Sequence, residues 1–474
     1  MNIVIRNMNY TAHKTYMINI KEGLNAISPI DGRYSHITYE LKQYFSESAL
    51  IKYRIMIEIY YLKTLLPFVG YNCTVEDTIK IHDIYEHWSM IDSIEVKNIE
   101  QTTNHDVKAV EIFIRNKLDD KSLGLYKEMV HFGLTSQDIN STANILSIRD
   151  TNVNIVIPLI IQFIDTLTEK SAAWNISMLS KTHGQCATPT TLKKEMNVFV
   201  YRLRRQFETL ETYKYRSKFG GAVGNLNSHY IAFSDKDWVT FADTFLQQFN
   251  LIRNTCTTQI DNYDNYSEIF DNLKRICVIL LDFSRDMWLY ISYDYFQQLC
   301  VEKEVGSSTM PHKINPIHFE NAEGNLLIAI ELLNFVSKKL PVSRLQRDLT
   351  DSTVLRNIGT IYGHIIISIK SLLNGINRVE PNTEYIKHDL INNNIVIAEA
   401  IQSILRRENV PDSYDIIKYI SRGNKIFDMK IVIVQLRERL VELSIESIRI
   451  DNIISEIIGL NVQTYTGNTD ENSK

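Results

Sequence analysis

One short segment carries the side chains best suited to chemistry. It reads Gly306-Ser307-Ser308-Thr309-Met310-Pro311-His312-Lys313-Ile314-Asn315-Pro316. Asparagine caps helices and proline tolerates the first helical position, so we expect a helix to begin at Asn315-Pro316. Backbone N–H groups, a lysine and a helix N-terminus together form an anion site, and a serine beside such charge can act as a base or a nucleophile. The alternative is ordinary capping beside a solvated Lys313.

Long helices must position this segment. Glycine and proline are scarce, at 17 and 9 of 474 residues, and neither occurs between Asn225 and Val305. An all-β fold needs turn residues every 8–12 positions or so and is therefore excluded. Apolar side chains at helical spacing predict helices over 273–291 and over 354–373, and a further helix from Pro316 that ends before Pro341. An extended bundle of such helices exposes apolar stripes unless it pairs with other chains, so we expect a homo-oligomer.

Composition narrows the class of protein. Hydrophobic residues make up 44% and the net charge is -5, which excludes a mostly disordered chain and argues against a nucleic-acid binder. The longest apolar runs fall short of the roughly 18 residues of a membrane-spanning helix. The five cysteines are widely spread and form no C-x-x-C, which fits a reduced, cytoplasmic protein without disulfides or a zinc site.

The same features suggest three domains. We expect an N-terminal helical domain with an extension over 1–125, and a central long-helix bundle with the signature segment over 126–380. A C-terminal helical domain with a polar tail is expected over 381–474. Neither a P-loop, an H-E-x-x-H nor a G-x-G-x-x-G after a strand is present, so we expect no metal and no cofactor.

The segment beginning at Gly306 resembles the signature of the fumarase/aspartase/argininosuccinate lyase superfamily, G-S-S-x-M-P-x-K-x-N-P. Its histidine before the lysine, and further segments in the same order, resemble the adenylosuccinate lyase family, especially its bacterial members. Two departures are Cys186 in place of a common proline and Gln137 in place of a common acid. The further segments are Asp31–Tyr34, Thr103–Lys108, Gly133–Asp138, Thr182–Gln185 and Arg347–Ser352.

This resemblance implies an all-α, three-domain lyase whose central bundle forms a tetrameric core. It implies a β-elimination that releases fumarate from adenylosuccinate to leave AMP. The same elimination is implied for the succinylated aminoimidazole-carboxamide ribotide of purine synthesis. A base must remove a proton next to a carboxylate, and an acid must protonate the departing nitrogen.

The resemblance assigns roles to residues of the signature and of the Thr182–Gln185 segment. Ser307 is the expected base, activated by Lys313 and the loop amides, and His183 is the expected acid. Lys313 and Asn315 are expected to stabilise the carboxylate oxygens of the intermediate. Glu320, one turn into the helix, is expected to hydrogen-bond His183 and raise its basicity.

The substrate carries a phosphate and two carboxylates, so several cations must converge on it, and arginine matches both groups bidentately. His131 is a candidate for supporting the site from behind, and His312 is left open between substrate and subunit contacts. By resemblance, the substrate-binding residues are Arg33, Tyr34, Asn104, His105, Asp106, Thr135, Ser136, Gln259, Asn315, Arg347, Ser352 and Arg356.

The predicted site residues come from distant stretches, and the resemblance implies that different subunits of a homotetramer bring them together. The small-molecule substrate is thus the expected ligand, with no nucleic acid and no membrane. Three alternatives stay open. The first is another lyase of the superfamily, such as argininosuccinate lyase, and the second is a non-catalytic helical scaffold. The third, a serine hydrolase, lacks G-x-S-x-G.

Overall fold

A computed structural model describes residues 23–300, 309–423 and 427–469 of the chain. The chain is 67% helical, with three two-stranded sheets among the described residues, and this confirms the predicted mostly helical fold. Ser307, the predicted base, and Ser308 lie outside the described residues.

The chain divides into two compact units, each built from three stretches. Unit 1 comprises Met1–Ile161, Gln206–Leu281 and Asn321–Ser371. Unit 2 comprises Gln162–Arg205, Asp282–Glu320 and Leu372–Lys474. Five long helices contribute residues to both units, and the division into three domains stays a prediction.

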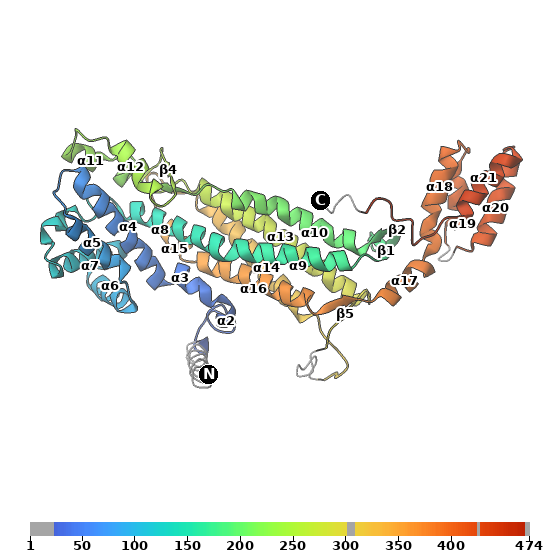
Figure 1. Cartoon of the computed structure of the whole chain (residues 1–474), viewed down its shortest axis with the longest axis horizontal. Coiled ribbons are helices and arrows are strands. Elements are labelled where there is room, and N and C mark those ends of the chain that lie inside the picture. Colours follow the sequence, from blue (N-terminus) through green and yellow to red (C-terminus); the bar gives the residue numbers. More distant parts are fainter. Residues whose placement is uncertain (1–22, 301–308, 424–426, 470–474) are drawn as a thin grey trace. The chain divides into compact units, whose positions relative to one another are not determined.

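Unit 1 begins with a group of helices whose apolar faces form one core (Figure 1). On α4 the buried Ile51, Ile55, Ile59, Leu62 and Leu66 follow helical spacing and face this core. Helix starts are capped locally, as at Thr74 and Asp77, which form a capping box. The helices of this core are α4 (Glu47–Phe68), α5 (Val75–Glu86), α6 (Met90–Thr103), α7 (Asp106–Asp120) and η2 (Gly124–Met129). The same stretch of the chain also contains α2 (Ser35–Thr38), η1 (Tyr39–Leu41), α3 (Lys42–Phe45) and α8 (Ser136–Thr151).

The other elements of unit 1 are two short strands, several short helices and parts of five long helices. Strands β3 and β4 pair in parallel, and Ser267 of α13 donates to the Ser337 carbonyl of α14 at 2.7 Å. These elements are β3 (Arg216–Lys218), η4 (Gly221–Val223), α11 (Asn227–Ala232), α12 (Trp238–Gln247), β4 (Ile252–Asn254) and α15 (Thr350–Leu355). The long helices shared with unit 2 are α9 (Ile157–Ala173), α10 (Leu192–Glu211), α13 (Asp264–Ser292), α14 (Ile317–Lys339) and α16 (Ile358–Ile376).

Helix α8 continues into α9 through one π-helical turn, η3 (Asn152–Val156). By length and composition this run, Ser136–Ala173, is apolar enough to cross a membrane, with a mean hydropathy of 1.3 over its most apolar window. Core helices pass the same test. Several polar side chains of α8 are buried in hydrogen bonds with the rest of unit 1, among them Asp138 and Ser141, as expected of a core helix.

Unit 2 contains a hairpin, parts of the long helices and a C-terminal helical group. Phe283 of α13 packs against Phe163 of α9 and Phe199 of α10. Helices α18 to α21 share an apolar core (Figure 1). The other elements of unit 2 are β1 (Ser177–Thr182), β2 (Gln185–Thr191), β5 (Phe296–Gln298), β6 (Val379–Pro381), α17 (Thr383–Asn392), η5 (Asn394–Ile397), α18 (Ala398–Arg407), α19 (Ser413–Ser421), α20 (Met429–Glu442) and α21 (Ser447–Ile458).

Two of the predicted long helices are confirmed as α13 and α14, and α14 begins directly after Asn315-Pro316 and ends before Pro341. The helix predicted over 354–373 is wrong in one respect, because the chain breaks there into α15 and α16. At the break the Asn357 N–H donates to Val354 O, three residues back, and Asn357 O then accepts from the Thr360 N–H. Arg356 lies at this break.

Candidate active site

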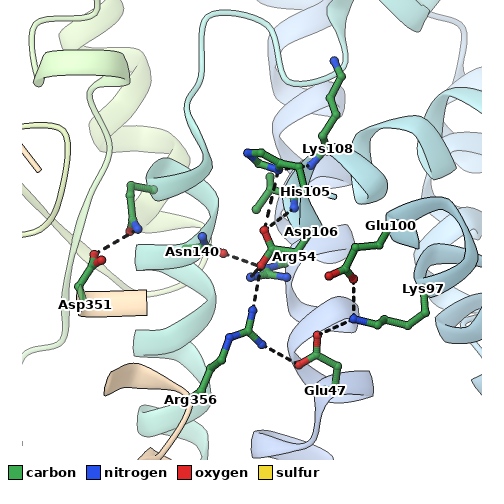
Figure 2. A network of polar contacts seen from close by, with 12 residues as sticks. Glu47, Arg54, Lys97, Glu100, His105, Asp106, Lys108, Asn140, Asp351 and Arg356 are labelled. Atoms are coloured by element: carbon green, nitrogen blue, oxygen red, sulfur yellow. Dashed lines mark hydrogen bonds and ion pairs between the residues drawn. The ribbon is translucent and has the colours of Figure 1, made fainter. Parts of the chain in front are cut away.

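Two arginine side chains from distant parts of unit 1 meet at Asp106, the first residue of α7. Arg54 Nη2 lies 2.7 Å and Arg356 Nη2 lies 3.1 Å from Asp106 Oδ2 (Figure 2). Arg356 Nη1 also pairs with Glu47 Oε2 at 2.9 Å. Arg54 is 3% exposed, and its Nε donates to Asn140 Oδ1 at 2.8 Å. Arg54 therefore fixes the Asp106 carboxylate from the buried side, and the guanidinium of Arg356 stays accessible to solvent.

The neighbours of Asp106 keep its side chain ionised near neutral pH. Burial alone would raise its pKa, but Arg54, the Val107 N–H and Arg356 outweigh burial and hold the pKa below its usual value. A cavity of about 30 Å³ beside this cluster is lined by Arg54, Gln137, Ser352 and Arg356, among others. The cavity has room for roughly one or two waters.

The N-termini of α7 and α8 carry several predicted binding residues. His105 caps α7, with its Nδ1 accepting the Lys108 N–H at 3.1 Å, and Asn104 before it has a left-handed backbone with φ 51°. Thr135 caps α8 in a capping box with Asp138, and Ser136 is the first residue of that helix. Both helix N-termini favour anions because their first N–H groups point outward.

The start of α8 is fixed by a buried ion pair. Lys218 Nζ lies 2.7 Å from Asp138 Oδ1, and neither side chain is exposed (0% for both). The Asp138 carboxylate also accepts backbone N–H donors from Thr135, Gly220 and Gly221. Burial alone would raise the pKa of Asp138, but Lys218 and these donors outweigh it and keep the pKa low.

Asp351 connects the segment Arg347–Ser352 to α8. Its Oδ2 accepts from Tyr263 Oη at 2.9 Å and from Gln137 Nε2 at 3.2 Å. Arg347 Nη2 lies 4.0 Å from Asp351 Oδ1, and the Ser352 N–H donates to the same oxygen at 2.7 Å. Gln137, the departure from the family pattern, thus acts as a donor to a buried carboxylate.

The remaining predicted binding residues of unit 1 form no hydrogen bond to the Asp106 or Asp351 clusters among the described contacts. Tyr34 Oη accepts from Asn321 Nδ2 of α14 at 2.9 Å. Arg33 is exposed beside it, and Gln259 is half-buried before α13. His131 lies in the loop before Thr135, with its Nδ1 2.5 Å from Glu58 Oε1 of α4.

His183 belongs to unit 2 and lies at the tip of the β1–β2 hairpin. Thr182 pairs with Gln185, so His183 and Gly184 form a two-residue turn with φ values of 52° and 71°. Such a turn needs positive φ at both positions, which glycine adopts readily. The His183 side chain is exposed at this tip.

The described end of the signature segment also lies in unit 2. The Lys313 N–H donates to Met310 O at 3.0 Å in a turn, and Gln298 Nε2 holds Ile314 O at 2.6 Å. Lys313 is exposed and Asn315 is half-buried just before α14. Glu320 Oε1 accepts from Trp288 Nε1 at 3.1 Å. Among the described residues, no hydrogen bond joins Glu320 to His183 within one chain.

The structure thus sorts the predicted residues by role. All predicted binding residues except Asn315 belong to unit 1, whereas His183, Lys313, Asn315 and Glu320 belong to unit 2. The described residues contain no cluster of histidine, cysteine, aspartate and glutamate side chains able to hold a metal ion. Sequence reasoning missed Arg54 and Glu58, for which the only signal was a charge within an apolar helix.

Family models match most of the chain. A lyase model matches residues 32–329, and a model of the adenylosuccinate lyase C-terminal region matches residues 343–458. The chain is 46% identical to the adenylosuccinate lyase of Dictyostelium discoideum, over 94% of this chain and 97% of that protein. It is 40% identical to that of Escherichia coli, over 85% and 90%.

Solved structures share the fold at low identity. A fumarate lyase from Mesorhizobium sp. BNC1 matches with a TM-score of 0.72 at 15% identity, over 92% of this chain and 96% of that chain. The 3-carboxy-cis,cis-muconate lactonizing enzyme from Pseudomonas putida matches with a TM-score of 0.70 at 18% identity, over 92% and 95%. At this identity the match speaks for the fold alone.

Proposed function

This chain belongs to the adenylosuccinate lyase family, and from that premise we propose that it eliminates fumarate from adenylosuccinate to leave AMP. The succinylated aminoimidazole-carboxamide ribotide carries the same succinyl-amine group. We propose it as the second substrate, because the elimination acts only on that group.

The observation that carries the proposal is the cluster of two arginines and two carboxylates in unit 1. Arg356 presents an accessible guanidinium beside the N-termini of two helices, and Asp106 and Glu47 hold that guanidinium. A nucleotide with a phosphate and two carboxylates needs such a concentration of donors. Family membership argues against a serine hydrolase, and intact Lys313, His183 and Glu320 argue against a non-catalytic scaffold.

The proposed chemistry uses acid–base groups of the protein. Ser307 removes the proton on the carbon next to a substrate carboxylate. Lys313 and Asn315 stabilise the dianion that forms, and His183 protonates the departing nitrogen. The C–N bond breaks with its electron pair going to nitrogen, so no oxidant, metal or cofactor is required.

We further propose a homotetramer in which subunits share active sites. The support is the division of the residues between the two units, together with exposed apolar side chains on the long helices, such as Leu327, Ile328 and Phe335 of α14. A mixture of Ser307→Ala and Arg356→Ala subunits, each inactive alone, should regain part of the turnover. A mixed tetramer that stays inactive would contradict shared sites.

A cytoplasmic location is proposed on the chemistry of the cysteines. Cys73, Cys186, Cys256, Cys277 and Cys300 are all free thiols. Free thiols of this number persist in a reducing compartment. Fractionation of cells that express the native chain, followed by detection with an antibody, tests the location.

The substrate proposal is tested by steady-state assays of the purified chain with adenylosuccinate and with argininosuccinate. Turnover of adenylosuccinate alone supports the proposal. Turnover of argininosuccinate instead would keep the elimination and overturn the assignment of the binding residues. A folded tetramer that is inactive on both would contradict the proposed function.

A further inference from the structure

A buried carboxylate lies directly behind His131. Glu58 of α4 has no exposed side-chain area (0%), whereas His131 keeps 15%. Glu58 Oε1 is 2.5 Å from His131 Nδ1, so the two side chains are hydrogen-bonded. Glu58 Oε2 is buried and has no hydrogen-bond partner.

This arrangement favours a positive charge on the imidazole. A buried carboxylate without a cation is strongly destabilising, and the one partner that Glu58 bonds through its side chain, among the described residues, is His131. A protonated imidazole supplies the charge and the Nδ1–H donor together. Once Nδ1 is committed to Glu58, only the Nε2–H of the same ring is left to donate.

The other charged and titratable groups around His131 favour the same state. On α7, Glu111 is 8% exposed and pairs with Lys108 and Arg115. Asp138 of α8 is paired with Lys218, and Tyr61 and His229 are buried and neutral near pH 7. Burial alone would lower the pKa of His131, but Glu58, then Glu111 and Asp138, outweigh burial and raise that pKa.

The loop that carries His131 is fixed to the same face of α4. Tyr61, one turn after Glu58, donates from Oη to Phe132 O at 2.6 Å. His131 itself has a left-handed backbone with φ 57°. Gly133 has φ 70°, and a Cβ added there would lie 2.6 Å from the His229 ring. The loop then leads directly into Thr135 and Ser136 at the start of α8.

We propose that Glu58 is a positioning residue, which keeps His131 protonated and oriented so that its Nε2–H binds an anionic group of the substrate. This inference rests on the proposed function, because the anion is a phosphate or carboxylate of the succinylated nucleotide. Glu58 acts through His131 and touches neither the substrate nor the reacting atoms.

The test is Glu58→Gln, which preserves shape and removes only the charge. The His131 ring is followed by NMR of histidine-labelled protein, with His131→Gln for assignment. In Glu58→Gln we expect His131 to lose its proton at least about tenfold more readily, and the alkaline limb of kcat/KM to move to lower pH. KM should rise about tenfold, with kcat changed less.

Tyr61→Phe is the matched control, because it contacts the same loop from the same helix without altering charge. It should leave the His131 titration and the alkaline limb in place. The double variant Glu58→Gln/His131→Gln should be little worse than His131→Gln alone, because Glu58 acts only through that ring.

An unchanged His131 titration in Glu58→Gln would overturn the inference, as would additive losses in the double variant. A shifted titration with an unchanged KM would also overturn it, since His131 would then not bind substrate. Failure of the proposed function is distinguishable from these outcomes, because it shows as a wild-type chain without turnover. The NMR titration needs no substrate.

Discussion

Arg356 and Asp106 form an ion pair with 3.1 Å between Nη2 and Oδ2, although 250 positions separate them in the chain. Arg54 holds Asp106 from the buried side at 2.7 Å, and Glu47 holds the second arm of Arg356 at 2.9 Å. The accessible arginine is therefore oriented before any substrate arrives, which lowers the entropy lost on binding.

This arrangement predicts the effect of replacing Arg356 with lysine. A lysine keeps the charge but cannot bridge Glu47, Asp106 and an anion with a planar fork. We expect Arg356→Lys to raise KM for adenylosuccinate by about tenfold, or ~1.4 kcal/mol, with little change in kcat. Steady-state kinetics measure this effect. The control is Arg437→Lys, because Arg437 of α20 forms an exposed pair with Asp451 of α21. Equal KM values for the two variants would refute the role of Arg356.

Ser307→Ala tests the proposed base. The variant loses the group that accepts the substrate proton, so turnover should fall by ~10²–10⁴. Size-exclusion chromatography should show the same oligomer as wild type. Ser308→Ala, one position along the signature, should lose much less. A Ser307→Ala enzyme with near-normal turnover would rule out this serine as the base.

His183→Gln tests the proposed acid. Glutamine cannot deliver a proton to the departing nitrogen, so kcat should fall by a similar ~10²–10⁴. The exposed His388→Gln on α17 should leave kcat unchanged. If His183→Gln raises KM and spares kcat, His183 binds substrate and is not the acid.

His229 predicts how stability depends on pH. Burial lowers the pKa of His229 from 6.5 to about 4. Between these values the unfolded chain binds a proton that the folded chain does not, so the free energy of unfolding falls as pH drops from 6.5 towards 4. The loss approaches ~3 kcal/mol at the acid end. Urea unfolding across this pH range measures it.

The matched variant for this prediction is His229→Phe, which suits the contacts with Phe132 and Trp238. Its stability should depend less on pH over the same range, whatever its stability near neutrality. Parallel pH curves for wild type and His229→Phe would show that His229 does not contribute.

The sequence predicts local features of this protein well. The start of α14 after Asn315-Pro316 and its end before Pro341 follow from capping and from the missing proline N–H, which act within one turn. The break at Arg356 was missed, because apolar residues keep helical spacing on both sides of it. The spacing of apolar residues does not show the backbone hydrogen bonds of Asn357, which mark the break between α15 and α16.

Long-range pairing explains the other misses. Glu58 and His131 are 73 positions apart, and Arg54 and Asp106 are 52 apart. A charge in an apolar helix indicates a buried partner, but only the folded chain shows which one. The hydrogen bond between Glu320 and His183 stays a prediction for the assembled protein, and within one chain Glu320 accepts a hydrogen bond from Trp288.

The elimination breaks a C–H bond next to a carboxylate and the C–N bond, and the reverse reaction forms both bonds. The most direct test runs the reaction backwards, with AMP and fumarate in deuterium oxide and mass spectrometry of the adenylosuccinate formed. We expect one non-exchangeable deuterium in the succinyl group of each product molecule, and almost none of this product with Ser307→Ala. Adenylosuccinate without deuterium, or no adenylosuccinate from the folded wild-type enzyme, would contradict the proposed elimination.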